Sequence, residues 1–175
     1  MTTRDKVFTA VFAAVLCAVS PFVIWIGPVP LSLATFAVYL AASVLYWKYG
    51  ALSVVLYVAL GLIGLPVFSG FTSGLPKLVG PTGGFLVGYI AMALVIGLIV
   101  TRNAHKKWIY PVAMALGTVV LYVCGLAWFM YSTGSTLPAS LMACVVPFLP
   151  GDAVKIILAS IIVPRLRTVV DKQTT

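Results

Sequence analysis

The distribution of charge along the chain is the strongest constraint on its fold. No charged residue occurs from Val7 to Trp47, a run of 41 residues. Long uncharged stretches also separate the later basic clusters, and only 8% of the residues are charged, against about 25% in typical soluble domains. So few charges cannot cover a folded surface in water. The sequence therefore predicts an integral membrane protein whose apolar surface faces lipid.

The uncharged stretches divide into six segments that could cross a bilayer. Two prolines in Gly27–Pro30 interrupt the first run, because each removes a backbone donor and ends a helix. We expect transmembrane helices at about 7–26, 32–47, 50–66, 83–101, 108–130 and 151–170, the last bent near Pro164. The first is longer than a signal-peptide core, so no cleavable signal is expected. The prediction is one all-α membrane domain over residues 1–175.

The basic residues predict the orientation of this bundle. Six passes place nine of the eleven Lys and Arg residues on one side, leaving Lys77 on the other side and Lys155 within the membrane. Cytoplasmic loops carry the excess of basic residues, so both termini of this multi-pass cell-membrane protein are expected in the cytoplasm. Short basic clusters between apolar stretches indicate contact with anionic lipid, and they argue against nucleic-acid binding despite the net charge of +8.

Two longer segments are expected on the outer side. Segment 64–84 is rich in glycine and proline yet carries apolar side chains, which indicates a cap folded against the bundle. Segment 131–150 contains an apolar stretch, 137–148, that predicts a short helix on the outer face. Together these two segments could close a cavity from outside. The alternative, that both are ordinary interfacial loops, fits the composition equally well.

An aspartate and a lysine near the start of the sixth predicted helix are the most informative pair. Asp152 is the only acid between Asp5 and Asp171, and Lys155 follows three residues later on the same helix face. An ionisable group in a membrane costs about 2.5–3.5 kcal/mol, so such groups usually face a cavity or a partner. The pair offers a small polar ligand an acceptor and a donor. Alternatively, Asp152 caps the helix N-terminus and Lys155 extends towards the headgroups.

Further candidate ligand contacts surround the glycine-rich segment before the fourth predicted helix. Phe71, Phe85 and Tyr89 could form the apolar wall of a pocket, although most such aromatic residues only pack. Gly83 belongs to the run Gly80–Gly84, which permits close backbone approach or a tight turn. The run lacks the Gly-Lys-Ser/Thr of a phosphate-binding loop, so no nucleotide site is expected.

Catalytic and metal chemistry have few candidate residues. The chain has no glutamate, one histidine (His105) in a basic loop, and three cysteines without C-x-x-C spacing. We therefore expect no enzyme activity, no catalytic residue and no metal or other cofactor.

One face of the first predicted helix is lined by small residues. Ala10, Ala14 and Ala18 recur at every fourth position and form what we call the alanine face. Small residues at this spacing let another helix approach closely. Spacing alone favours packing inside the bundle; the alternative is a docking face for a partner protein.

Several segments resemble the BioY family, the biotin-binding S components of energy-coupling factor (ECF) transporters. They are PVPLSLATFAVY at 28–39, GLIGLPVFSGFTSG at 61–74, LVGPTGGFLVGY at 78–89 and PFLPGDAVK at 147–155. The resemblance covers nearly the whole chain in the family's order. It implies a six-helix S-component fold with a biotin pocket near the outer face, closed by the loops after the first and third helices.

The resemblance also implies residue roles and partners. Asp152 and Lys155 match the P-G-D-x-x-K motif that contributes to substrate binding in that family. For a biotin ligand, our own expectation is that Asp152 accepts from the ureido N–H groups and Lys155 donates to the ureido oxygen or the carboxylate, with Lys77 as a second candidate for the carboxylate. The alanine face matches the docking face for a transmembrane coupling subunit, and two cytoplasmic ATPases would supply energy. The expected function is capture of biotin as a transported ligand. The alternatives are an S component for thiamine or riboflavin, a self-sufficient secondary transporter or channel, and, least favoured, a membrane enzyme.

Overall fold

The computed structural model describes residues 2–25, 29–103 and 106–172. Its elements, in chain order, are α1 (Thr3–Val19), β1 (Val23–Trp25), β2 (Pro30–Ser32), α2 (Ala34–Val44), α3 (Tyr46–Leu62), α4 (Leu75–Val79), α5 (Gly83–Asn103), α6 (Ile109–Thr133), α7 (Leu137–Cys144) and α8 (Leu149–Lys172). The all-α class is confirmed, with one short antiparallel hairpin that pairs Val23 with Ser32. His105 and the predicted helix break at 27–28 lie outside the described residues.

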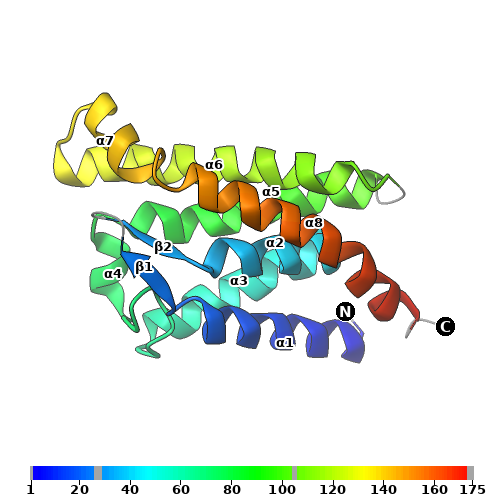
Figure 1. Cartoon of the computed structure of the whole chain (residues 1–175). Coiled ribbons are helices and arrows are strands. Elements are labelled where there is room, and N and C mark those ends of the chain that lie inside the picture. The colour runs from blue at the N-terminus through cyan, green and yellow to red at the C-terminus, as the bar shows by residue number, and fades with distance from the viewer. Residues whose placement is uncertain (1, 26–28, 104–105, 173–175) are drawn as a thin grey trace.

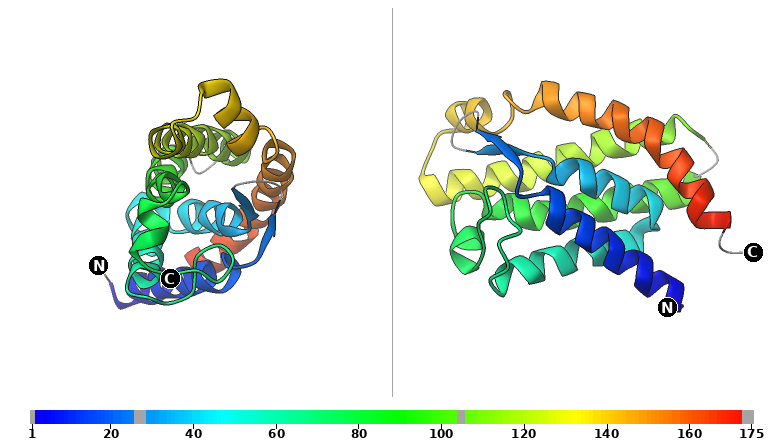
Figure 2. Two further views of the ribbon diagram at one scale, coloured as in Figure 1. Left: turned by 90° about the vertical axis from the view of Figure 1, so that its left-hand side faces the viewer. Right: turned by 60° about the horizontal axis from the view of Figure 1, so that its bottom comes forward.

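The long helices form one bundle whose two ends carry different parts of the chain (Figure 1). Both chain termini lie at one end, and the β1–β2 hairpin, α4 and α7 gather at the other, as the right-hand view in Figure 2 also shows. We call the end that carries the hairpin, α4 and α7 the cap end. Segment 64–84 folds against the bundle there, as predicted: Gly70 N–H donates to Pro21 O at 2.9 Å, and Gly74 N–H donates to Gly61 O at 2.8 Å.

Length and hydropathy support a membrane protein. Among the described residues, α5 with 21 residues and α6 with 25 residues are each sufficient to cross a membrane, and α7 with α8 forms a third candidate, bent by 47°. The apolar helices α2 and α3 are shorter, with 11 and 17 residues. The six-pass count stays a prediction.

Helix α2 is the central element of the bundle. Nine of its 11 residues are buried, and it packs against α1, α3, α5 and α8. It ends earlier than predicted, because Tyr46 takes a left-handed φ of 63° where α3 begins. The Arg167 guanidinium stacks 4.4 Å from the Tyr46 ring and donates to Tyr110 Oη at 3.0 Å, which holds this junction. The short α2 can be buried because its neighbours enclose it.

Helix α8 differs from the prediction in two respects. It begins at Leu149, two residues earlier than expected, and it continues through Pro164 to Lys172. The bend that the structure shows lies between α7 and α8. The start of α8 places its first two turns beside the start of α2.

Candidate functional site

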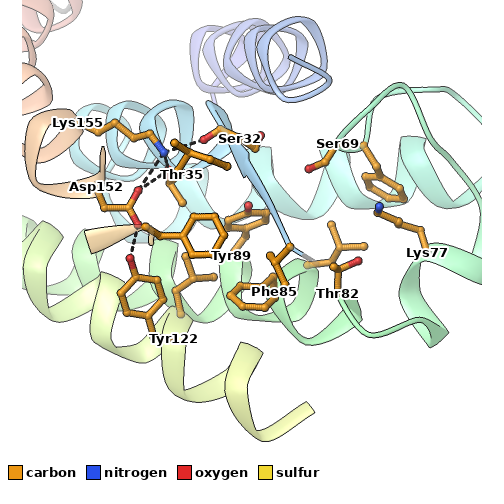
Figure 3. Close-up of a pocket in the computed structure, with 16 residues that line it drawn as sticks. Ser32, Thr35, Ser69, Lys77, Thr82, Phe85, Tyr89, Tyr122, Asp152 and Lys155 are labelled. Carbon is orange, nitrogen blue, oxygen red and sulfur yellow. Dashed lines mark hydrogen bonds and ion pairs between the residues drawn. The ribbon is translucent and has the colours of Figure 1, made fainter. Parts of the chain in front are cut away.

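A cavity lies beneath the cap end, lined by residues of β2, α2, α4, α5, α6 and α8. Its empty space is about 590 Å³ when the open solvent at its mouth is included, and the part that can hold the centre of a water-sized sphere is about 50 Å³. Figure 3 shows polar groups at its two ends and aromatic rings between them. We call these the ion-pair end (Ser32, Thr35, Tyr122, Asp152, Lys155) and the Lys77 end (Ser69, Lys77, Thr82).

The lysine at the ion-pair end is fully engaged. Lys155 Nζ lies 3.0 Å from Asp152 Oδ1, and the two residues are only 8% and 4% exposed. Nζ also donates to the Ser32 carbonyl at 2.7 Å and to Thr35 Oγ1 at 2.9 Å. An ammonium has three N–H donors, so these three contacts use all of them.

The aspartate at the same end can still accept a further hydrogen bond. Its Oδ1 accepts from Lys155 and, at 3.3 Å, from Thr35 Oγ1, and its Oδ2 accepts a short hydrogen bond from the Tyr122 hydroxyl. An ionised carboxylate offers about four acceptor positions. One position therefore remains for a ligand N–H that enters the cavity.

The backbone around Ser32 explains how its carbonyl reaches the lysine. Ser32 Oγ donates to Ser20 O at 2.9 Å and accepts from Ala34 N–H at 2.9 Å, which fixes the turn from β2 into α2. Short side chains that bond to nearby backbone stabilise such turns. The fixed turn directs the Ser32 carbonyl and the Thr35 side chain towards α8.

Aromatic side chains form the middle of the cavity. Phe85 and Tyr89 both line it, as predicted, and are 9% and 8% exposed. The Phe85 ring lies over Gly125 of α6, where an added Cβ would be 2.4 Å from Phe85 Cε1. The Tyr89 hydroxyl has no hydrogen-bond partner among the described residues, which leaves it available to a ligand.

At the opposite end, Lys77 of α4 is half-buried and lines the cavity (Figure 3). Burial lowers the pKa of its ammonium group below the ordinary value of 10.5. Within the described part of the chain, no hydrogen bond or ion pair engages this ammonium. The Ser69 and Thr82 side chains line the same end.

Comparison with known proteins identifies the family. A sequence model of the BioY family matches residues 1–172. The chain belongs to the BioY family. Among its relatives are the biotin transporter BioY of Thermotoga maritima, 36% identical over 167 residues (94% of this chain and 96% of the relative), and the probable biotin transporter BioY of Pyrococcus horikoshii, 34% identical over 167 residues (95% and 98%).

A solved structure matches the fold of this BioY-family chain. It is the crystal structure of the S-component for biotin from an ECF-type ABC transporter, with a TM-score of 0.86 and 30% identity, and the match covers 96% of this chain and 95% of the other.

The helix-capping alternative for the P-G-D-x-x-K motif of this BioY-family chain is wrong. Asp152 lies inside the first turn of α8, and its own N–H donates to Phe148 O at 2.8 Å. Its carboxylate bonds to side chains of α2 and α6 and to Lys155. Lys155 is buried and does not extend towards headgroups. Both residues face the cavity.

Phe71 was a candidate wall residue, and the structure contradicts this. Its side chain is 60% exposed, its φ is 57°, and its ring packs edge-on against Phe22 with centroids 5.5 Å apart. Phe68, which the sequence reasoning did not select, lines the cavity instead and is fully buried. Its ring lies edge-on to Tyr57 and over Gly61, where an added Cβ would be 2.2 Å from Phe68 Cζ.

Gly83 was a candidate ligand contact, but the neighbouring Thr82 lines the cavity in its place. Gly83 is buried at the start of α5, and an added Cβ would lie 1.6 Å from Leu78 O. Its lack of a side chain lets α5 begin directly against α4, which carries Lys77.

The alanine face is turned outwards. Ala10, Ala14 and Ala18 are all exposed, whereas Thr9, Ala13 and Leu16 form the buried side of α1. Packing of the alanine face inside the bundle is therefore wrong. An exposed row of small residues leaves α1 open to close approach by another helix.

Proposed function

We propose that this chain is the biotin-capturing S component of an ECF-type transporter. The observation that carries the proposal is the ion-pair end of the cavity, where a buried carboxylate keeps one acceptor position beside a lysine whose donors are all engaged. The ureido ring of biotin presents N–H donors that fit this acceptor. The relatives named above, a biotin transporter and a probable biotin transporter, support this ligand over others.

The remaining cavity suits the rest of that ligand. The bicyclic ring and aliphatic tail of biotin would lie between Phe68, Phe85 and Tyr89, which exclude water from both sides. The free Tyr89 hydroxyl can donate to the ureido oxygen. Lys155 would act on the ligand through Asp152, because it has no N–H left to donate.

We further propose that six helices cross the membrane and that both termini are cytoplasmic. Both termini lie at one end of the bundle, as an even number of passes requires. Nine basic residues were assigned to that side from the sequence, which agrees with the cytoplasmic excess of such residues. Long apolar side chains are exposed along α6 and α8, where lipid would cover them: Val112, Leu116, Val119, Val123, Ile157, Ile161.

The alanine face is our candidate contact for the transmembrane coupling subunit of the transporter. Its exposure supports this role, because docking needs a face that the bundle does not already use. Two cytoplasmic ATPases would then supply energy to the assembled transporter. The test compares two cysteine variants, Ala14→Cys on the alanine face and Val112→Cys on α6, by crosslinking each to the coupling subunit. Ala14→Cys should crosslink. Crosslinking of Val112→Cys without crosslinking of Ala14→Cys would contradict the contact.

Binding and uptake measurements test the function directly. The purified protein should bind radiolabelled biotin saturably, with unlabelled thiamine and riboflavin unable to compete. Competition by either vitamin at the same concentration as biotin would indicate an S component with a different ligand. Liposomes that contain this chain alone should not accumulate biotin, and concentrative uptake by them would indicate a self-sufficient transporter.

A further inference from the structure

The two lysines that line the cavity differ in how far their N–H donors are already engaged. Lys155 donates to three acceptors and carries an ion pair with Asp152. A ligand carboxylate placed beside it would have to displace one of these contacts. It would also lie next to the Asp152 carboxylate, and two like charges at such distances repel strongly in a buried site.

Lys77 presents the contrasting case at the other end. It is half-buried and lines the cavity, and none of its three N–H donors is engaged by a described residue. Among the described residues, Asp152 is the only acid that lines the cavity, and the stick view places it at the far end from Lys77 (Figure 3). Ser69 and Thr82 add two hydroxyls at the Lys77 end, neither of which bonds within the described residues.

We infer that Lys77 anchors the carboxylate of the ligand, with Ser69 and Thr82 beside it, and so fixes the direction in which the ligand lies. The inference rests on the proposed function, since it takes biotin as the ligand. It makes Lys77 a specificity-determining residue: the cavity selects a free acid and discriminates against the same molecule with a neutral tail. The ureido ring is then directed to Asp152, and the tail lies under α4.

The test compares biotin with biotinamide, whose tail is uncharged, on purified wild-type protein and two variants. The charge-assisted contact corresponds to about 10- to 100-fold in affinity. Wild type should bind biotin tighter than biotinamide by this factor. Lys77→Gln should lose the same factor for biotin and keep its affinity for biotinamide, so that the preference disappears. Lys77→Arg should retain most of the preference, because the positive charge remains.

The matched control is Lys48→Gln, which removes an exposed lysine that does not line the cavity and should change neither affinity. A Lys77→Gln variant that keeps the wild-type preference would overturn the inference and leave biotin capture intact. Equal losses for both ligands would show a structural role for Lys77 and would also overturn it. Failure of the wild-type protein to bind biotin at all would refute the proposed function itself.

Discussion

Removing the Asp152 carboxylate should have separable effects on stability and on binding. At 3.0 Å, the attraction between the Lys155 and Asp152 charges is roughly 5–6 kcal/mol with an effective dielectric constant of about 20. In Asp152→Ala, the ammonium stays buried without an anion. Breaking a buried pair in this way costs about 3–5 kcal/mol in the free energy of unfolding.

Removing both charges should restore most of this loss. In the double variant Asp152→Ala/Lys155→Met neither charge of the pair remains, and replacement of a buried pair by apolar groups is often neutral or stabilising. We expect the free energy of unfolding of the double variant to exceed that of Asp152→Ala by about 2 kcal/mol or more. Biotin affinity should instead fall by about 10- to 150-fold in both variants, because the acceptor for the ureido N–H is absent from each.

Two measurements on the same detergent-purified samples decide the matter. Thermal unfolding followed by tryptophan fluorescence gives the order of stability, and titration with radiolabelled biotin gives the affinity. A double variant as unstable as Asp152→Ala would show that the ion pair is not the source of the loss. Wild-type biotin affinity in either variant would remove Asp152 from the binding site.

Three further changes test other parts of the cavity. Tyr122→Phe removes a donor to Asp152 and should weaken biotin binding by about tenfold in the same titration; an unchanged affinity would show that this hydroxyl does not orient the carboxylate. Gly61→Ala would place a Cβ 2.2 Å from the Phe68 ring, and should cost about 1–3 kcal/mol in stability and weaken biotin binding as the ring moves. Burial lowers the pKa of Lys77 below the ordinary value of 10.5, so biotin affinity should be highest below that lowered pKa and fall as pH rises through it. Lys77→Gln should remove this fall, and an identical pH profile in the variant would assign the titration to another group.

The sequence predicted the helices and the central pair for physical reasons. Charge-free stretches of this length form buried or lipid-facing helices, so the approximate positions of the helices follow from composition. Their ends do not: the first predicted helix, 7–26, ends at Val19, and Val23–Trp25 form β1 instead. Asp152 and Lys155 could be selected because charges are costly in such a segment and a three-residue spacing brings them to one face. Both arguments need only local sequence.

The hydroxyl partners of that pair could not be selected in the same way. Thr35 is 117 residues from Asp152 in the chain, and Tyr122 is 30 residues away. A hydroxyl in an apolar helix usually bonds to its own backbone, as Thr101 does with Gly97 O and Ser160 with Ile156 O. Only the packing of α2 and α6 against α8 separates the two uses.

The aromatic wall shows a different limit. Phe68 and Phe71 are three residues apart in a glycine-rich segment that has no helical or strand periodicity. Phe68 is buried and Phe71 is exposed because of the backbone between them. Gly70 and Phe71 both take positive φ, 75° and 57°, and this turns the Phe71 side chain outwards. A left-handed conformation at a phenylalanine is unfavourable for the isolated residue, so local preference gives the wrong answer there.

The two ends of the cavity should contribute unequally to biotin affinity, because their side chains are preorganised for the ligand to different degrees. At the ion-pair end, Lys155 and Thr35 already hold the Asp152 carboxylate in place, so a ligand N–H binds without further ordering. At the other end, Lys77 must give up side-chain freedom, at a cost of up to about 1.5–2 kcal/mol, before it can hold a carboxylate. Asp152→Ala should therefore weaken biotin binding more than Lys77→Gln does. The reverse order would mean that Lys77 is held in place by contacts other than the ligand, and that the preorganised end of the cavity is the one under α4.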